Sequence, residues 1–474
     1  MDTRQLLSTT VLYGIADVVV LVVGGFLLLP LYTRTLSQAE FGIYVIVRAN
    51  TEIFTYLLYF GLPSAVARVY FDHKKRNQHV EYLSSVLMFF LLNLVVFGAL
   101  LSVWGAHLWT LLSPATPVHP YLGFSAAIAA VGFFAAIGSL WLRMEGRAAA
   151  FAGLQVGASL VLAATAVVNL VVLDKGLPGL LSALLISSAC SAVMVPWLFG
   201  RRFRPVIRWA HITESMRYAV PIVIGYLAYF VLNRISTLIL QRHVGVDQIA
   251  IFGLAQQLAM LVTIAAAAFG KASQPAVYAA EPAQAAELME RSGKILMLLM
   301  FCVTSTVVLF ASDIFSLVAP KSYASGYEIL LILLVASFAY SFTLISDTAL
   351  LYHRRPKMSV AVSIVGAILS ASLGVWLIPL YQLHGAALAI AGAFFAMTLL
   401  SHWVAHRVTG HSYFATMLLA VAAICVLASF SAWLRRQGFP TPTSVSLKIG
   451  ISTLIFATIY LLHIRKPLAK PCAL

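Results

Sequence analysis

Long apolar stretches separated by short polar connections run along almost the whole chain. A helix needs about 20 residues to cross a hydrocarbon core about 30 Å thick, and we count fourteen segments of that kind. Their approximate bounds are 8–32, 41–62, 82–103, 119–142, 149–172, 177–199, 218–241, 249–271, 294–311, 327–352, 358–380, 384–404, 415–434 and 446–464. Barrel strands of about ten alternating residues would be much shorter. The pattern therefore predicts an all-α polytopic membrane protein with about 14 transmembrane helices.

The composition excludes a soluble multidomain protein. Of the 474 residues, 61% are hydrophobic and only 10% are charged, and the mean hydropathy is +0.94. Soluble domains are about half apolar and about a quarter charged. The four cysteines lie far apart, so the sequence offers neither a disulfide framework nor the ligand spacing of a zinc site.

The distribution of the positive charges predicts the orientation in the membrane. The formal net charge is +15. With the N-terminus placed inside, the predicted cytoplasmic loops carry about three times as many Lys and Arg residues as the outer loops. This bias predicts an even number of crossings and two cytoplasmic termini. Topology and contact with anionic lipids account for most of the positive charge, so we expect no nucleic-acid partner.

Two cytoplasmic connections are long enough to contain local structure. Residues 201–217 are basic, with interleaved Phe203, Ile207 and Trp209, and we interpret them as an interfacial segment that links two halves of the chain. Residues 272–293 are rich in Ala and Glu. They predict a short amphipathic helix on the cytoplasmic face.

The two halves have matching hydropathy patterns. A shift of 208 residues lays 27–46 over 235–254, and Arg34 then falls on Arg242. Repeats of several helices are a common plan in transporters. We therefore predict a parallel pseudo-repeat of two six-helix lobes around a central cavity, followed by a helix pair. The expected bounds are 1–200 for the N-lobe, 201–217 for the linker, 218–408 for the C-lobe and 409–474 for the C-terminal helix pair.

Three motifs resemble a known family. The segments LLLPLYTRTLSQAEFGIYVI (27–46) and YFGLPSAVARVYFD (59–72) resemble the opening of the polysaccharide transporter, or Wzx-like oligosaccharide flippase, family of the multidrug/oligosaccharidyl-lipid/polysaccharide (MOP) export superfamily. LIPLYQLHGAALAIAGAF (377–394) is similar to that family's junction between its eleventh and twelfth helices. Gly374 and Gln382 depart from the family pattern, in which Asn and Gly are common, so we expect a different shape for the outer turn.

The resemblance implies a fold and an activity. It implies a V-shaped pair of lobes around a cavity that opens to alternate sides of the cell inner membrane. It also implies movement of polyprenyl-diphosphate-linked oligosaccharides from the inner to the outer leaflet. The expected partners are the lipid-linked glycan, membrane lipids and a polysaccharide polymerase or export machinery.

Ionisable residues within the predicted spans are the strongest candidates for function. Such a residue costs a few kcal/mol or more in a membrane and usually faces a cavity or a partner. Five positions qualify: Asp17, Arg48, Glu52, Arg234 and Asp347. Arg48 and Arg234 each lie about seven residues from the outer end of a span, which places both roughly 10 Å below the outer surface.

Polar stripes accompany these charges on three predicted helices, and each stripe must face a helix contact or a water-filled cavity. Span two carries Arg48, Glu52, Thr55 and Tyr59; span seven carries Tyr226, Phe230, Arg234, Thr237 and Gln241; span eight carries Gln256, Met260, Thr263, Ala267 and Lys271. Because guanidinium groups bind phosphate through two parallel hydrogen bonds, we predict a cationic site for a diphosphate and sugars. Its substrate-binding residues are Arg48, Arg234, Tyr59, Tyr226 and Gln256, and Tyr56 and Tyr229 are further rings on which sugars can stack.

Structural explanations compete with these roles. Arg48 and Glu52 are four residues apart and could neutralise each other, and Arg234 could be purely structural. Asp17, Glu52 and Asp347 are candidates for ion coupling.

Other readings remain open for two of these carboxylates and for the histidines. Asp17 could instead pair with a base or hydroxyl, and Asp347 with Arg354 or Arg355. His402, His406 and His411 lack nearby carboxylates, so we predict no metal site, no cofactor and no catalytic residue.

Three classes of function fit a polytopic chain of this kind. The favoured one is a flippase for an O-antigen, capsule or exopolysaccharide repeat unit. A multidrug or cation exporter of the same superfamily is the alternative, and it should carry intramembrane carboxylates in its site. A polysaccharide polymerase or ligase needs a sizeable outer loop, whereas 104–120 is among the longest here. No GxxxxGK[ST] motif is present, and we predict a transporter that is not an enzyme.

Overall fold

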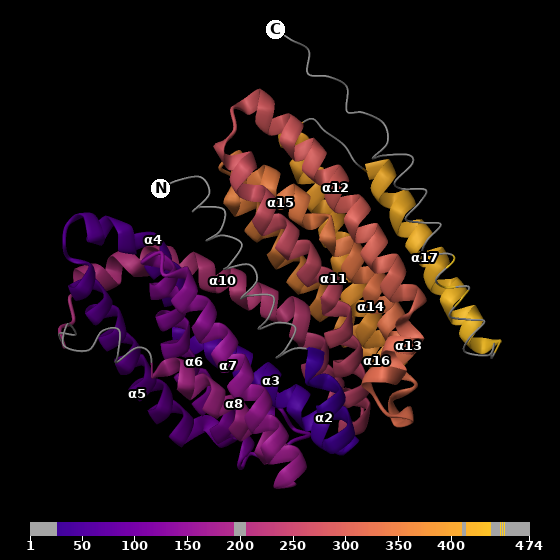
Figure 1. The fold of residues 1–474 in the computed structure, drawn as a ribbon, viewed down its shortest axis with the longest axis horizontal. Coiled ribbons are helices and arrows are strands. Elements are labelled where there is room, and N and C mark those ends of the chain that lie inside the picture. The colour runs from indigo at the N-terminus through magenta and orange to yellow at the C-terminus, as the bar shows by residue number, and fades with distance from the viewer. Residues whose placement is uncertain are drawn as a thin grey trace. The chain divides into compact units, whose positions relative to one another are not determined.

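The computed structural model describes residues 26–193, 205–409 and 414–437, together with residues 446, 448 and 450. Within these ranges the chain forms helices joined by short connections, with no strand (Figure 1). Ten of the described helices are long and apolar enough to cross a membrane. The predicted all-α membrane class is therefore confirmed, while the count of fourteen spans and the cytoplasmic termini stay predictions. Most of the first span, 8–32, and of the last, 446–464, lies outside the described residues.

The internal contacts divide the chain into two compact units, Met1–Gly253 and Leu254–Leu474. The first contains α2 (Leu29–Thr35), α3 (Gln38–Tyr59), α4 (Leu62–Lys75), α5 (His79–Leu112), α6 (Tyr121–Met144), α7 (Ala148–Val167), the π-helix η2 (Val168–Val172), α8 (Gly176–Ala192) and α10 (Trp209–Leu240). The division falls within α11 (Val246–Ala279). It lies later than the predicted linker, and the six-plus-six lobes stay a prediction.

The second unit holds the remaining described helices. They are α12 (Pro282–Leu309), α13 (Ala311–Val318), the 3₁₀-helix η4 (Lys321–Tyr323), α14 (Gly326–Ser341), α15 (Thr343–Tyr352), α16 (Pro356–Thr409) and α17 (Phe414–Arg436). Within this unit α14 packs against α16 and α17, and α15 packs against α16.

The first motif of the sequence begins α3 with a capping box. The Ser37 side chain accepts a hydrogen bond from the Glu40 backbone N–H, and the Glu40 carboxylate accepts one from the Ser37 N–H in return. The second carboxylate oxygen of Glu40 accepts a hydrogen bond from the backbone N–H of Leu177 at 3.1 Å. One side chain thus caps α3 and also ties it to the first turn of α8.

The second motif forms the joint between α3 and α4. Phe60 and Gly61 both adopt left-handed backbone conformations, with φ of 49° and 69°. A Cβ atom on Gly61 would lie 2.9 Å from the carbonyl oxygen of Ala219 on α10, so glycine permits both the turn and the close approach of α10. Pro63 in the first turn of α4 lacks the N–H that a helix start leaves unpaired anyway.

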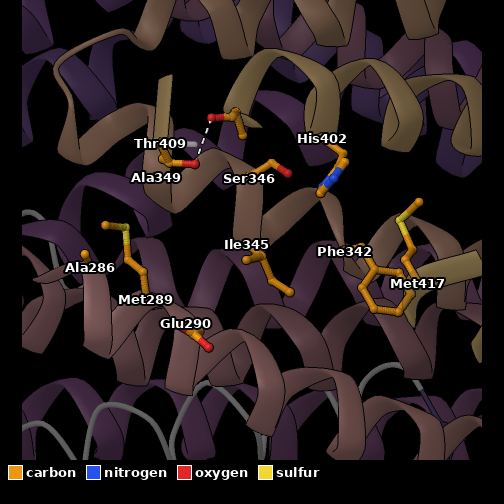
Figure 2. A pocket seen from close by; sticks show the side chains of 11 residues that line it. Ala286, Met289, Glu290, Phe342, Ile345, Ser346, Ala349, His402, Thr409 and Met417 are labelled. Atoms are coloured by element: carbon orange, nitrogen blue, oxygen red, sulfur yellow. Dashed lines mark hydrogen bonds between the residues drawn. The ribbon is translucent and has the colours of Figure 1, made fainter. Parts of the chain in front are cut away.

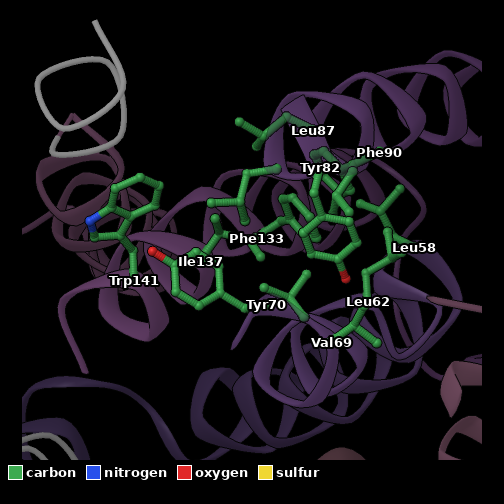
Figure 3. Packing of buried hydrophobic residues seen from close by; sticks show 13 residues of the cluster. Leu58, Leu62, Val69, Tyr70, Tyr82, Leu87, Phe90, Phe133, Ile137 and Trp141 are labelled. Atoms are coloured by element: carbon green, nitrogen blue, oxygen red, sulfur yellow. The ribbon is translucent and has the colours of Figure 1, made fainter. Parts of the chain in front are cut away.

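The apolar core of the first unit fixes the helices that carry the candidate site. α10 packs against α3, α4 and α5. Figure 3 shows the buried cluster, in which Leu58 of α3, Tyr70 of α4, Phe90 of α5 and Phe133 of α6 lie close together. Because this cluster is buried and rich in aromatic rings, it holds α3, α4, α5 and α6 in a fixed register.

The third motif forms a sharp turn within α16. Its two helical segments are joined at Gln382, whose φ of 48° and ψ of −119° are not helical. A Cβ atom on Gly385 would overlap the carbonyl group of Leu377, so the second segment approaches the first too closely for any other residue. The break falls between the predicted spans 358–380 and 384–404, at the residue that departs from the family pattern.

Two predicted connections differ from the structure. Residues 272–293 were expected to form a separate short amphipathic helix, which is wrong, because α11 continues to Ala279 and α12 begins at Pro282. The Ala-rich sequence favours helix continuation, and proline is well suited to a first helical turn. α10 begins at Trp209, so its first turns occupy the end of the expected linker 201–217.

Candidate functional site

The centre of the candidate site is an ion pair between two membrane-spanning helices. Nε of Arg234 on α10 donates a hydrogen bond to Oε2 of Glu52 on α3 at 2.8 Å. The two side chains are 20% and 24% exposed. The pair therefore excludes a simple Arg48–Glu52 neutralisation along one helix, because Glu52 binds the arginine of the other helix.

Aromatic side chains surround this ion pair and connect the same two helices. The Tyr56 hydroxyl donates to the other Glu52 oxygen at 3.0 Å. Its ring stacks on Tyr226, with centroids 5.4 Å apart and planes inclined by 18°, and meets Phe230 edge-on at 6.4 Å. The Tyr226 hydroxyl lies 2.7 Å from Oγ of Ser64. The polar stripe of α10 is thus mainly a contact with α3 and α4.

Arg48 lies one helical turn before Glu52 on the same face of α3, about 6 Å along the helix axis. Its side chain is exposed, and among the described residues it has no ion pair or hydrogen bond. Glu52 is already neutralised by Arg234. Two guanidinium groups and one carboxylate leave this part of the helix pair with one excess positive charge.

The other two predicted substrate-binding residues have different surroundings. The Tyr59 ring packs edge-on against Phe133 at 5.2 Å and against Phe90 at 6.4 Å, so its faces belong to the aromatic core of the first unit. Gln256 lies on α11 in the second unit and is 7% exposed. The structure thus places Arg234 and Tyr226 of α10 against α3 within the first unit, and Arg48 lies one turn before Glu52 on α3.

The three candidates for ion coupling also separate. Asp17 lies outside the described residues, and Glu52 belongs to the ion pair with Arg234. Asp347 on α15 accepts a hydrogen bond from Ser359 of α16 at 2.7 Å. Among the described residues Asp347 forms no ion pair with Arg354 or Arg355, so that alternative explanation is wrong.

A separate pocket lies in the second unit, lined from α12, α15, α16 and α17 (Figure 2). It contains about 570 Å³ of space between atoms, a volume that includes open solvent. Glu290, Ser346 and His402 bring polar groups to a lining that is otherwise mostly apolar. None of the predicted site residues lines it, so this pocket does not belong to the cationic site. His411, the third histidine of the sequence cluster, lies outside the described residues.

Sequence reasoning missed the cross-helix pairing of Glu52. The two partners are 182 residues apart, and no local pattern in a single sequence indicates a contact over that separation. Ser64 was missed as well, although it lies only three residues after Gly61 of the left-handed joint. The only signal for this contact in the sequence was that Arg234 in span seven and the polar stripe with Glu52 in span two lie at a similar depth in the membrane.

Comparison with known proteins identifies the fold. The lipid II flippase MurJ in an inward closed conformation superposes with a TM-score of 0.72 at 13% identity, covering 96% of this chain and 100% of that one. An inward-facing multidrug resistance MATE family transporter of the MOP superfamily superposes with a TM-score of 0.61 at 17% identity, covering 87% of this chain and 94% of that one. A MOP superfamily transporter from Pyrococcus furiosus superposes with a TM-score of 0.53 at 15% identity, covering 85% of this chain and 95% of that one. Reverse polarity of its binding pocket suggests a different function for that transporter. A comparison with curated protein sequences found no significant match.

The chain therefore has the fold of the flippase MurJ and of MATE transporters of the MOP superfamily. A polysaccharide biosynthesis protein model matches residues 11–279, and a MatE model matches residues 221–376. The first match covers more than half of the chain, so the chain belongs to the polysaccharide biosynthesis protein family.

Proposed function

We propose that this protein is a flippase that moves a polyprenyl-diphosphate-linked oligosaccharide from the inner to the outer leaflet of the cell inner membrane. The observation that carries the proposal is the exposed guanidinium of Arg48 beside the neutral Glu52–Arg234 pair. The cargo is an O-antigen, capsule or exopolysaccharide repeat unit. The family match and the likeness to a lipid II flippase support this class of cargo.

The physical argument rests on the location of that charge. A guanidinium group within a membrane-spanning helix is too costly in contact with lipid, so Arg48 faces water or an anion. Diphosphate offers oxygen atoms in the geometry that a guanidinium binds through two parallel hydrogen bonds. The polyprenyl tail stays in the lipid while the head group occupies this cationic site, and alternating access re-exposes it on the outer side.

The remaining residues have supporting roles in the proposal. Tyr226 presents its ring to the sugars, Gln256 stays a proposed substrate ligand, and Tyr59 holds the aromatic wall behind α3. Arg234 is the second phosphate ligand. It is released when Glu52 takes up a proton or another cation, and Glu52, Asp17 and Asp347 are the proposed coupling groups.

The larger architecture belongs to the same proposal. We propose lobes at 1–200 and 218–408, joined by the basic linker 201–217 and followed by the helix pair 409–474, with both termini in the cytoplasm. The expected protein partner is a polysaccharide polymerase or export machinery that receives the flipped glycan.

Reconstitution tests the proposal directly. Proteoliposomes would contain a polyprenyl-diphosphate oligosaccharide, and the fraction reached by a membrane-impermeant glycosidase would be measured over time. Loss of a charge-assisted bidentate contact costs about 1.5–3 kcal/mol, so Arg48→Ala should lower the rate roughly ten- to one-hundred-fold. Arg234→Ala should behave similarly, and Arg48→Lys should retain part of the activity.

Arg68→Ala is the control, because Arg68 is an exposed arginine on α4 that pairs with Asp72 of the same helix and lies over the Tyr218 ring at 5.8 Å, apart from the Glu52–Arg234 pair. It should leave the rate unchanged. Transport at the wild-type rate by both Arg48→Ala and Arg234→Ala would refute the cationic-site proposal, provided that both variants remain folded in the membrane.

Cation export is the second candidate, favoured by the MatE match over residues 221–376. Such a site should have net negative charge to hold a cationic drug. Arg48, Glu52 and Arg234 together sum to one positive charge, so we expect no protection of cells against cationic drugs when the protein is overproduced.

A further inference from the structure

We propose that His73, His211 and Glu214 form a binding site for one divalent transition-metal ion of the zinc class. His73 lies near the end of α4, and the other two lie in the first turns of α10. One ligand atom from each residue lies within 4.8 Å of the other two. This site is separate from the cationic site and does not depend on the proposed transport function.

The local sequence explains why the ligands converge. His211 and Glu214 are three residues apart, so their side chains share a face of α10. His73 reaches that face because α4 packs against α10. Its Nε2 lies 3.1 Å from Oε2 of Glu214, although the two residues are 141 positions apart in the sequence.

Neighbouring rings hold the histidines in place. The His73 imidazole stacks on Tyr82 of α5, with centroids 4.5 Å apart and planes inclined by 10°. It meets the His211 ring edge-on at 4.6 Å. Tyr82 is itself fixed by a 2.9 Å hydrogen bond between its hydroxyl and Ser215. A ligand set that is held before the ion arrives loses little entropy on binding.

The hydrogen bonding of the two imidazoles is incomplete. Nε2 of His211 and Nδ1 of His73 are buried and have no hydrogen-bond partner among the described residues. A buried nitrogen without a partner costs stability. A metal ion bound to Nε2 of His211 would remove that cost, which is the observation that distinguishes this cluster from an ordinary His–Glu ion pair.

The ligand chemistry and spacing select the ion. Two imidazole nitrogens and one carboxylate oxygen are a donor set that zinc accepts, with bonds of about 2.0–2.1 Å. Tetrahedral geometry at that bond length separates ligand atoms by about 3.3 Å. The 3.1 Å between His73 and Glu214 is already near this value, and only a small side-chain movement is required of His211.

Access and local charge also allow a cation to enter. The Glu214 side chain is 41% exposed, so the ion can arrive from solvent and keep a water molecule in the fourth position. The nearby guanidinium of Arg208 is neutralised by an ion pair with Glu81. The Glu214 carboxylate brings negative charge to the cluster for the cation.

Binding to the whole protein, purified in detergent without a histidine tag, tests the proposal. Zn²⁺ affinity would be measured by competition with a chromogenic chelator, stoichiometry by elemental analysis, and geometry by the visible absorption of the Co²⁺ form. We expect one ion per chain and an intense tetrahedral Co²⁺ spectrum. His211→Gln and Glu214→Gln should each weaken Zn²⁺ binding at least roughly tenfold.

Two further variants sharpen the experiment. His107→Gln changes an exposed histidine on α5 that is not part of the cluster, and it should bind Zn²⁺ like the wild type. His73→Gln should abolish Zn²⁺ binding. If this buried variant fails to fold, Glu214→Gln still tests the site, because the Glu214 side chain is 41% exposed. Absence of stoichiometric Zn²⁺ in the wild type, or unchanged affinity in His211→Gln and Glu214→Gln, would overturn the proposal.

Discussion

The Glu52–Arg234 ion pair should contribute measurably to the association of α3 with α10. Only 24% and 20% of the two side chains are exposed. A hydrogen bond between charged groups contributes about 1.5–3 kcal/mol, whereas neutral hydrogen bonds between membrane helices average only about 0.6 kcal/mol. Glu52→Gln leaves Arg234 charged and unpaired, so we expect a loss of about 2 kcal/mol in the free energy of unfolding.

A double-mutant cycle isolates the pairwise interaction from other effects of the substitutions. Glu52→Gln, Arg234→Gln and the double variant would be unfolded by titration with sodium dodecyl sulfate in mixed micelles, followed by tryptophan fluorescence. The expected coupling energy is about 1.5–3 kcal/mol, because the double variant has no uncompensated charge.

The neutral contact between Ser64 of α4 and Tyr226 of α10 provides the control. A cycle of Ser64→Ala with Tyr226→Phe should give about 0.6 kcal/mol. If the coupling of Glu52 with Arg234 does not exceed that of the control cycle, the charged pair does not stabilise the helix contact, and the reasoning is refuted.

Two further predictions concern the surroundings of this helix pair, and melting temperatures in detergent check both. Gly61→Ala should destabilise the protein by about 1–3 kcal/mol, because a left-handed residue gains a Cβ atom that meets the α10 backbone. Gly225→Ala is its control: a Cβ atom there meets nothing within 4 Å, so the helix should gain about 0.5–1 kcal/mol. Burial alone would raise the pKa of Glu145, but hydrogen bonds, led by that from Lys74, hold this pKa below its usual value near 4.5. The stabilisation is therefore present above about pH 4.5 and lost as the pH falls through the folded-state pKa, so the advantage of the wild type over Glu145→Gln should shrink below about pH 4.5. An advantage that is constant with pH would contradict that assignment.

The fold class could be predicted from the sequence because the membrane imposes it locally. Apolar segments of about 20 residues need no knowledge of their neighbours to be recognised, and most predicted spans between 41 and 434 coincide with described helices. The segment 272–293 was misjudged because its Glu and Arg residues interrupt the apolar pattern without interrupting helix propensity. Hydropathy measures where a membrane is crossed, whereas backbone preference decides where a helix ends.

The candidate site could be predicted only in part, since its partners come from distant parts of the chain. The depth of Arg48 and Arg234 in their spans follows from counting residues, but the choice of Glu52 by Arg234 depends on how α3 and α10 pack. The cluster of His73, His211 and Glu214 could not be predicted for the same reason, because His73 is far from the other two residues in the sequence. Its only local signal is the three-residue spacing on α10, and His73 sits within a basic segment that suggests solvent exposure.

The two left-handed residues between α3 and α4 impose a restriction on chain length. An α-helix turns by about 100° per residue, so one residue inserted between Leu62 and His73 would rotate the end of α4 by that angle. The imidazole of His73 would then leave Tyr82 and His211 and point elsewhere. Substitutions on the exposed face of this 14-residue helix should be tolerated, whereas a single insertion or deletion should not. The spacing from Gly61 to His73 is therefore a more sensitive marker of this arrangement in related sequences than the identity of the residues between them.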